Sequence, residues 1–151
     1  MASPSLRQNG RMGTVEYRSA EPAEVPALLE FWAEAGENDS RPADSEDAVE
    51  ALLLRDPDAL IVAVADGRIV GTVIAGFDGW RYHLYRLAVD PDSRRRGIGS
   101  ALLDRAESRL RDLGATRIDA MVLDANARGQ AIWRSRGYGP QPEWSRWVRH
   151  L

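Results

Sequence analysis

The chain reads Arg94-Arg95-Arg96-Gly97-Ile98-Gly99 between a strand-like run, Tyr85-Arg86-Leu87-Ala88-Val89, and an amphipathic segment from Ser100 to Leu113. A glycine-rich turn that opens a helix exposes unpaired backbone N–H groups beside the positive end of the helix dipole. Such a turn suits a phosphate or pyrophosphate, and glycine lets the ligand approach the backbone closely. Three adjacent arginines are, however, equally typical of a solvent-exposed basic loop. The flanking sequence favours the first interpretation.

Two blocks of sequence extend this arrangement. The first runs from Leu87 to Leu103 and joins a strand of small and aliphatic residues to the turn and a helix. The second has Asn126 and, after six residues, Trp133-Arg134-Ser135-Arg136-Gly137-Tyr138. In this order the blocks resemble the GNAT superfamily of N-acetyltransferases, in particular its small single-domain bacterial members. The resemblance spans the chain from about Val15 to the C-terminus.

The resemblance implies that acetyl-CoA binds along these blocks. The pantetheine arm would lie where two central strands separate at a bulge, against the backbone of Leu87, Ala88 and Val89. Asn126 corresponds to a residue that reaches the cofactor arm, although an asparagine before a helix also serves as an N-cap. For each arginine, direct contact and solvent exposure both stay open. The pyrophosphate would be held by the turn, which comprises Arg94, Arg95, Arg96, Gly97, Ile98, Gly99 and Ser100.

Three residues are candidates for the chemistry. Trp133 stands where the family commonly has a tyrosine that protonates the departing thiolate, and it also belongs to the implied cofactor site. Indole has no such proton to give, so a packing role for Trp133 is equally open. A regular strand would place residues 83, 85, 87 and 89 on one face, with His83 and Tyr85 in line towards the thioester. Histidine exchanges protons near neutral pH, so His83 is the candidate base, with a surface histidine as the alternative.

The predicted function is an N-acetyltransferase that passes an acetyl group from acetyl-CoA directly to a primary amine in a ternary complex, without a metal. The alternative is a catalytically weak acyl-CoA-binding sensor or partner-binding module. The acceptor is a small molecule or a peptide: a simple amine, an antibiotic, an amino acid or a protein N-terminus. Acidic residues over 30–47 would attract a cationic amine, or form a solvated face. We expect a monomer or a homodimer.

Composition excludes several other classes of protein. The 151 residues, 44% of them hydrophobic, suffice for one globular domain. No apolar run approaches the roughly 20 residues of a membrane span, and the N-terminus lacks a signal-peptide core. Without cysteine there is no disulfide framework or thiol nucleophile, which favours a cytoplasmic location. The net charge of −3 argues against general nucleic-acid binding.

The order of predicted elements indicates an α+β protein with the GNAT fold. We expect a flexible N-terminal tail over 1–13 and the acetyltransferase domain over 14–151. One helix opens at Pro22 and ends at Gly36, and Asp44 or Ser45 caps the next. Helices over 100–113 and 128–136 bring the number to about four. The central sheet is mixed but mostly antiparallel, with six to seven strands, among them those over 14–19, 60–65, 68–77, 82–89, 118–122 and 145–150.

Overall fold

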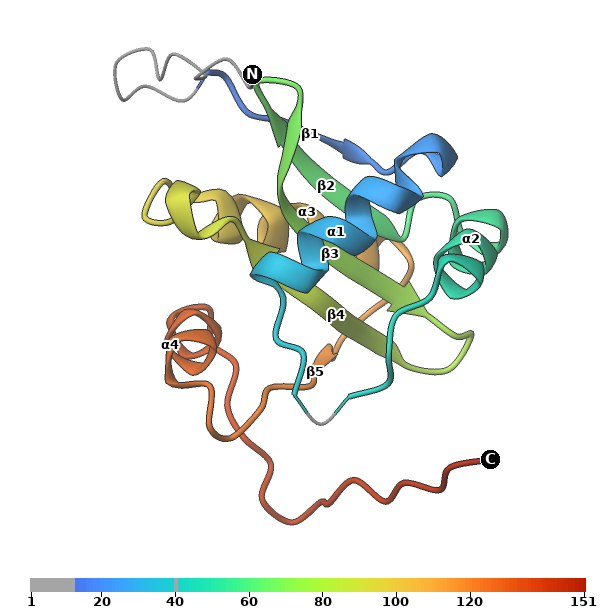
Figure 1. Ribbon diagram of the computed structural model, residues 1–151. Helices are drawn as coiled ribbons and strands as arrows, with labels where there is room; N and C mark the ends of the chain where they lie inside the picture. The colour runs from blue at the N-terminus through green and yellow to red at the C-terminus, as the bar shows by residue number, and fades with distance from the viewer. Residues whose placement is uncertain (1–12, 40) are drawn as a thin grey trace. The chain divides into compact units, whose positions relative to one another are not determined.

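A computed structural model describes residues 13–39 and 41–151 of the chain, in two units that divide after Met121. The predicted N-terminal tail therefore lies outside the described residues, except for Gly13. The helices and strands of the first unit are β1 (Glu16–Ser19), α1 (Val25–Ala35), α2 (Glu46–Arg55), β2 (Leu60–Ala65), β3 (Arg68–Phe77), β4 (Tyr82–Val89), α3 (Ile98–Asp112) and β5 (Asp119–Ala120), with short 3₁₀ turns at Pro22–Glu24 and Pro91–Ser93 (Figure 1). The second unit contains α4 (Ala127–Ser135).

The sheet has the order β1-β2-β3-β4-β5. The first four strands are antiparallel, and β5 joins β4 in parallel. A two-residue turn of Asp66 and Gly67 connects β2 to β3, with φ of 51° and 72°. Positive φ at both positions is the geometry of a hairpin turn whose twist matches that of the strands. The Asp-Gly pair therefore sets the register of the hairpin, as its sequence indicates.

The described part of the chain has five strands, so the expectation of six to seven is wrong. The strand predicted over 118–122 shortens to Asp119–Ala120, and no strand forms over 145–150. Ile118, Ala120 and Val122 alternate as in a strand, and Trp147 and Val148 favour a strand by residue type, but a strand also needs a neighbour to take its N–H and C=O groups. In the second unit Trp147 and Val148 are instead 95% and 65% exposed.

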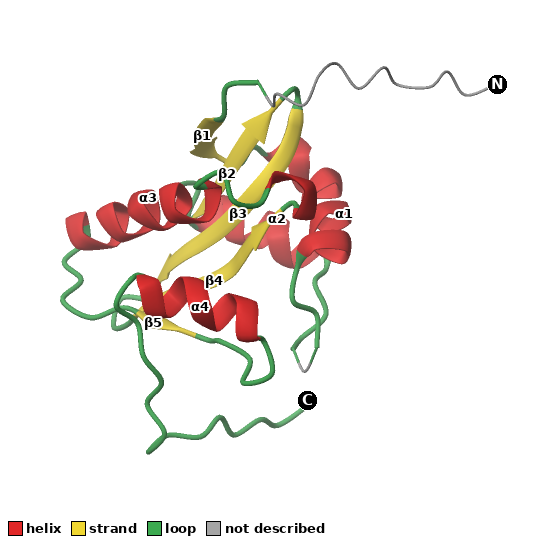
Figure 2. Ribbon diagram, turned by 90° about the vertical axis from the view of Figure 1, so that its left-hand side faces the viewer, coloured by secondary structure: helices red, strands yellow, loops and turns green. Residues whose placement is uncertain are grey.

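Helices cover both faces of the sheet: α1 and α2 lie on one side, and α3 lies on the other (Figure 2). On the first side Leu28, Trp32 and Leu53 pack in one buried apolar cluster with Val62 and Ala88 of the strands. On the other side the sheet approaches α3 closely at Gly71. A Cβ there would lie 2.9 Å from side-chain atoms of both Ile98 and Leu102 of α3. None of the described helices is long and apolar enough to span a bilayer.

Candidate active site

A β-bulge interrupts β4 just before the glycine-rich turn. Tyr85 pairs with Ile74 of β3, and Ala88 pairs with Thr72, so the two residues Arg86 and Leu87 oppose a single residue of β3. Arg86 has φ of 52°, in the left-handed region that residues other than glycine rarely adopt. A bulge bends its strand and redirects the side chains that follow, and strained backbone of this kind is common at functional sites.

The bulge overturns the expectation that residues 83, 85, 87 and 89 share one face. Ala88 packs in the apolar cluster beneath α1 and α2. Tyr85 lies on the same face as Ala88, because the bulge inserts one extra residue between them. Leu87 and Val89 therefore face α3. Of the four side chains expected in line, Leu87 and Val89 therefore lie on the opposite face from Tyr85. Towards the turn, β4 offers the thioester backbone groups and no further side chain of that line.

Beyond the bulge β4 still pairs with β3, but the backbone groups of Val89 point away from it. The N–H of Asp90 donates to the carbonyl oxygen of Val70 at 2.8 Å. Because antiparallel pairs alternate, the N–H and C=O of the preceding residue, Val89, point to the opposite side of the strand. On that side the ladder between β4 and β5 has two pairs, the last at Leu84 and Ala120. Within the described sheet the pairing of β4 with β5 therefore ends before the bulge.

The glycine-rich turn continues from this strand end into α3. Arg95 and Gly97 both have left-handed backbone, with φ of 64° and 74°. Gly97 is the N-cap of α3, so no side chain caps the first turn, and the first intrahelical bond runs from the N–H of Ala101 to the carbonyl of Gly97 at 3.0 Å. The N–H groups of the first turn are therefore left for an anion. A Cβ added at Gly97 would meet no atom within 4 Å.

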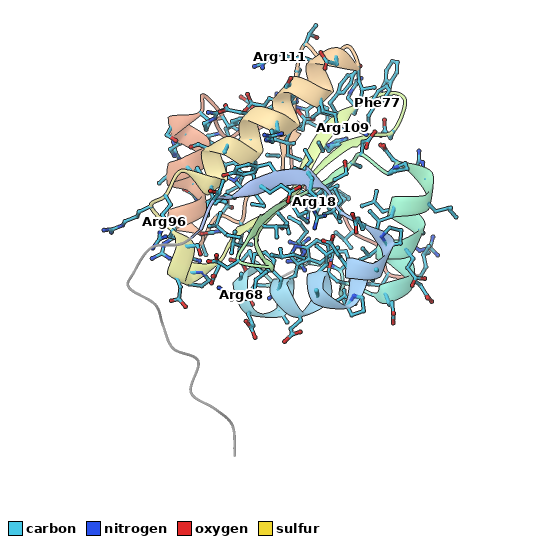
Figure 3. The ribbon with its side chains drawn as sticks, turned by 90° about the horizontal axis from the view of Figure 1, so that it is seen from above. Arg18, Arg68, Phe77, Arg96, Arg109 and Arg111 are labelled. Atoms are coloured by element: carbon cyan, nitrogen blue, oxygen red, sulfur yellow. The ribbon has the colours of Figure 1, made fainter. Side chains whose placement is uncertain are left out.

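The three arginines of the turn differ in exposure. Arg94 is half-buried, whereas Arg95 and Arg96 are exposed. Arg96 extends outward from the ribbon (Figure 3). Ile98 is buried, so it contributes its backbone to the turn and its side chain to the core. The backbone of the turn is consequently a better defined anion site than any one guanidinium.

His83 and Tyr85 form an aromatic pair on the α1 face of β4. Their ring centroids lie 5.7 Å apart at 29° between planes, and Tyr85 is 42% exposed. Asp78, in the turn before β4, accepts hydrogen bonds from the N–H groups of Arg81 and Trp80 at 2.6 and 2.7 Å. These bonds lower the pKa of Asp78, and the charge of His83 adds to the effect. His83, the candidate base, is therefore close enough to interact electrostatically with the Asp78 carboxylate, which was not identified from the sequence.

In the second unit, Asn126 and Trp133 occupy the two ends of α4. The side-chain oxygen of Asn126 accepts a 2.9 Å hydrogen bond from the N–H of Gly129, so Asn126 is the N-cap. At the other end Gly137 has φ of 88°, and Tyr138 donates its N–H to the carbonyl of Trp133 at 3.0 Å. This is a Schellman motif, completed by an edge-to-face contact of the Trp133 and Tyr138 rings at 4.9 Å. Trp133 thus has a packing role in the helix end.

A buried arginine at the bulge was not identified from the sequence. The Arg86 guanidinium forms an ion pair with Asp44 and hydrogen bonds with the carbonyl of Glu37 and the side chain of Asn38. Burial lowers the pKa of Arg86 to about 10, with a contribution from the charge of Arg41, so the group stays protonated at neutral pH. Its partners lie more than 40 residues away in sequence, beyond the reach of local patterns.

A shallow depression lies apart from the bulge and the turn. Its volume is about 290 Å³, and its lining consists of Arg18, Ser19, Asp58, Ile61, Arg105 and Arg109. Arg18 of β1 pairs with Glu24 at 2.6 Å, and Arg109 of α3 pairs with Asp56 (Figure 3). None of the residues that line the depression belongs to the bulge or the turn, and we place the candidate site at the bulge and the turn.

Comparison with known proteins identifies the family. The family model described as Acetyltransferase (GNAT) family matches residues 25–138, which is most of the chain. The chain belongs to this family. An acetyltransferase of Pectobacterium atrosepticum is similar to it, with 45% identity over 83 residues, which cover 55% of this chain and 59% of that protein. The chain thus spans about three fifths of the length of that curated relative.

Solved structures of GNAT proteins share the fold. A ribosomal-protein-alanine N-acetyltransferase of Brucella melitensis is 29% identical, with a TM-score of 0.66 over 81% of this chain and 83% of the other. The PaiA N-acetyltransferase of Thermoplasma acidophilum, solved in complex with coenzyme A, is 19% identical, with a TM-score of 0.68 over 85% of this chain and 91% of the other. At that identity the second likeness shows the fold alone.

These findings confirm the resemblance to small GNAT N-acetyltransferases and the α+β fold with four helices. Within the first unit, the GNAT chain brings His83, Tyr85, the backbone of 87–89 and the turn over 94–100 into one continuous stretch. Asn126 and Trp133 belong to the second unit and are defined by their own contacts in α4. The roles of all these residues towards a cofactor remain predictions.

Proposed function

We propose that this GNAT protein is an N-acetyltransferase that transfers an acetyl group from acetyl-CoA to a primary amine by direct attack in a ternary complex. One observation carries the proposal. The bulge of β4 and the uncapped N-terminus of α3 follow each other along the chain, separated only by residues 88–97. An extended acyl arm that ends in a pyrophosphate requires both features in this order.

The residues of the first unit fit the cofactor. The N–H and C=O of Val89 point away from β3, where they can pair with an extended pantetheine arm in the manner of a strand. The space beside Gly97 admits a phosphate against the N–H groups of Gly99 and Ser100. Arg94, half-buried at the turn, can add a charge-assisted contact. This set of groups would hold acetyl-CoA with its thioester near the bulge.

The chemistry then divides among groups of the chain. When bound, acetyl-CoA supplies the acetyl group as a thioester, and the C–N bond to the amine forms as the C–S bond breaks. Backbone N–H groups of β4 at the bulge polarise the thioester carbonyl. His83, which shares the α1 face with Tyr85, takes the proton that the ammonium acceptor must lose before attack. Trp133 has no ionisable proton, so CoA leaves as thiolate; the amine nitrogen releases its second proton to solvent as the amide forms, and the thiolate takes a proton from solvent.

The acceptor is a small-molecule or peptide amine. The name of the Brucella relative indicates an alanine of a ribosomal protein as its acceptor, and an N-terminal amine of this kind is one candidate here. Acidic residues on and beside the segment between α1 and α2 favour a positively charged acceptor. They are Glu30, Glu34, Glu37, Asp39, Glu46 and Asp47, whereas the charge of Asp44 is paired with Arg86.

A second function, an acyl-CoA-binding sensor without turnover, has one observation in its favour. Trp133 is committed to the Schellman motif of α4 and replaces the phenol that the family commonly has there. Both functions share every cofactor contact, so binding does not separate them. The test is thiol release from acetyl-CoA with a panel of amines that includes alanine-terminated peptides. Amine-dependent release supports the enzyme, whereas calorimetric binding of acetyl-CoA without release supports the sensor.

A further inference from the structure

Arg86 joins the bulge of β4 to the segment between α1 and α2, residues 36–39 and 41–45. Its side chain is only 4% exposed and forms an ion pair with the Asp44 carboxylate. The guanidinium also donates to the Asn38 side chain at 3.0 Å and to the carbonyl oxygen of Glu37 at 3.2 Å. Its carbon lies 5.3 Å from the centre of the Trp32 ring of α1. One guanidinium thus binds both ends of the segment and the helix that precedes it.

The backbone of Arg86 is held as firmly as its side chain. Its carbonyl oxygen accepts a 2.8 Å hydrogen bond from the hydroxyl of Thr72, which in turn accepts one of 2.9 Å from the indole N–H of Trp32. Both hydrogen bonds are buried, where such bonds are strongest. Arg86 is therefore held by its side chain to the segment between α1 and α2 and by its backbone to β3.

The Arg86 guanidinium is packed tightly against the end of α1. A Cβ added at Gly36, the C-cap of α1, would lie 2.6 Å from a terminal nitrogen of Arg86. Asp44 is free to pair with Arg86 because Ser45 caps α2, its hydroxyl oxygen accepting from the N–H of Ala48 at 3.1 Å. The two polar residues before α2 thus have separate roles, one in the helix cap and one in the ion pair.

The position of this contact determines which substrate it affects. Tyr85, directly before Arg86, lies with His83 on the face that α1 and α2 cover. The glycine-rich turn leads instead to α3, on the other face (Figure 2). The proposed function brings the amine to the thioester by way of His83, on the face where Arg86 holds the segment between α1 and α2, and assigns the phosphates to the start of α3.

We infer that Arg86 is a positioning residue for the acceptor amine: by tying Asp44, Asn38 and Glu37 to the bulge of β4, it fixes the acceptor side of the site while leaving the cofactor side independent. This inference rests on the proposed function. Arginine suits this positioning role, because the five N–H donors of a guanidinium can bind a carboxylate and two further oxygens at once.

The test replaces Arg86 while keeping its backbone. Asparagine tolerates left-handed φ, so Arg86→Asn removes the guanidinium and retains the bulge. We expect kcat/KM for the amine to fall about 10- to 100-fold, since small displacements of a substrate-positioning group have effects of that size. The Kd of acetyl-CoA should stay close to the wild-type value. Hydrogen exchange should accelerate between α1 and α2 and remain unchanged in the β2–β3 hairpin.

Three further single variants and one double variant complete the test. Asp44→Asn is nearly isosteric and weakens the same ion pair, so it should reproduce the acceptor effect if Arg86→Asn fails to fold, and the double variant should add little to either. Arg86→Lys restores one contact and should recover part of kcat/KM. Arg109→Asn is the matched control, because it breaks the ion pair with Asp56 in the same unit. It should lower stability without affecting the amine selectively.

The outcomes are distinguishable. Parallel losses in acetyl-CoA affinity and amine kcat/KM, or the same selective loss in Arg109→Asn, would overturn the inference and make Arg86 a structural residue only. Normal amine kinetics in Arg86→Asn and Asp44→Asn would also overturn it. Absence of turnover in the wild-type protein would instead overturn the proposed function. Hydrogen exchange then still reports whether Arg86 anchors the segment.

Discussion

The hydroxyl of Thr72 donates a buried 2.8 Å hydrogen bond to the carbonyl oxygen of Arg86, fourteen residues away in sequence. The bond joins the middle of β3 to the bulge of β4. The same hydroxyl oxygen accepts from the indole N–H of Trp32 in α1 at 2.9 Å. A single threonine therefore satisfies one donor and one acceptor, and it links the helix layer to the strand that carries the candidate site.

Thr72→Val should destabilise the protein by about 2 to 4 kcal/mol. Valine fills nearly the same volume but leaves the Trp32 N–H and the Arg86 carbonyl buried without their partner, and each such loss costs roughly 1–3 kcal/mol. Urea unfolding measures the change. Thr72→Ser, which retains the hydroxyl, is the control and should lose much less. Equal stability of the two variants would show that the hydrogen bonds contribute little.

The parts of this fold that short sequence signals determine could be predicted. Asp66-Gly67 predicts a hairpin because glycine readily takes positive φ, and the turn over 94–99 opens a helix for the same local reason. Gly137 likewise ends α4. In each case the deciding residue lies within a few positions of the feature, so the chain itself contains the signal.

The parts that depend on distant partners could not be predicted. Arginine is not a turn residue, and its left-handed backbone at position 86 follows from contacts with Thr72 and Asp44, far away in sequence. The same limit applies to the segments over 118–122 and 145–150, where apolar residues indicated strands. Periodicity reports which side chains prefer burial, but it does not report whether a neighbouring strand is present.

Gly97→Ala should weaken acetyl-CoA binding about 10-fold or more, and Gly67→Ala should not. Both glycines have positive φ, of 74° and 72°, and both have open space where a Cβ would project. An alanine therefore costs each site about the same 1 kcal/mol in folding free energy. Only at Gly97 does the methyl group enter the proposed phosphate site, where losing one charge-assisted hydrogen bond costs roughly 1.5–3 kcal/mol. Titration calorimetry with acetyl-CoA measures both.

If the two glycine variants bind acetyl-CoA with the same affinity, the turn is not the pyrophosphate site. Thermal unfolding of both proteins, recorded alongside, separates loss of the site from loss of the fold. A comparable decrease in Tm with different affinities is the expected pattern.

Trp133→Tyr should raise turnover relative to Trp133→Phe. Both replacements retain an aromatic ring against Tyr138 and lose the same part of the indole, so their packing costs should be similar. Only tyrosine adds a proton for the departing thiolate, and general acid catalysis contributes up to roughly 10²–10⁴-fold when that step limits the rate. Single-turnover kinetics with acetyl-CoA and an active amine measure the difference. Identical rates would assign position 133 to packing alone.

His83→Gln should lower kcat/KM for the amine at neutral pH by about 10²-fold, since general base catalysis is typically worth at least that much. Glutamine preserves much of the shape of the side chain next to Tyr85 but cannot accept the proton, so acetyl-CoA affinity should be unchanged. The loss should shrink as the pH rises, because a growing fraction of the acceptor is then already the free amine. His150→Gln, at the exposed end of the chain, is the control and should leave the pH profile unaltered. Full activity of His83→Gln at every pH would remove His83 from the chemistry. A large loss in Tyr85→Phe would then assign proton removal to a relay through the phenol, the next group on the same face of β4.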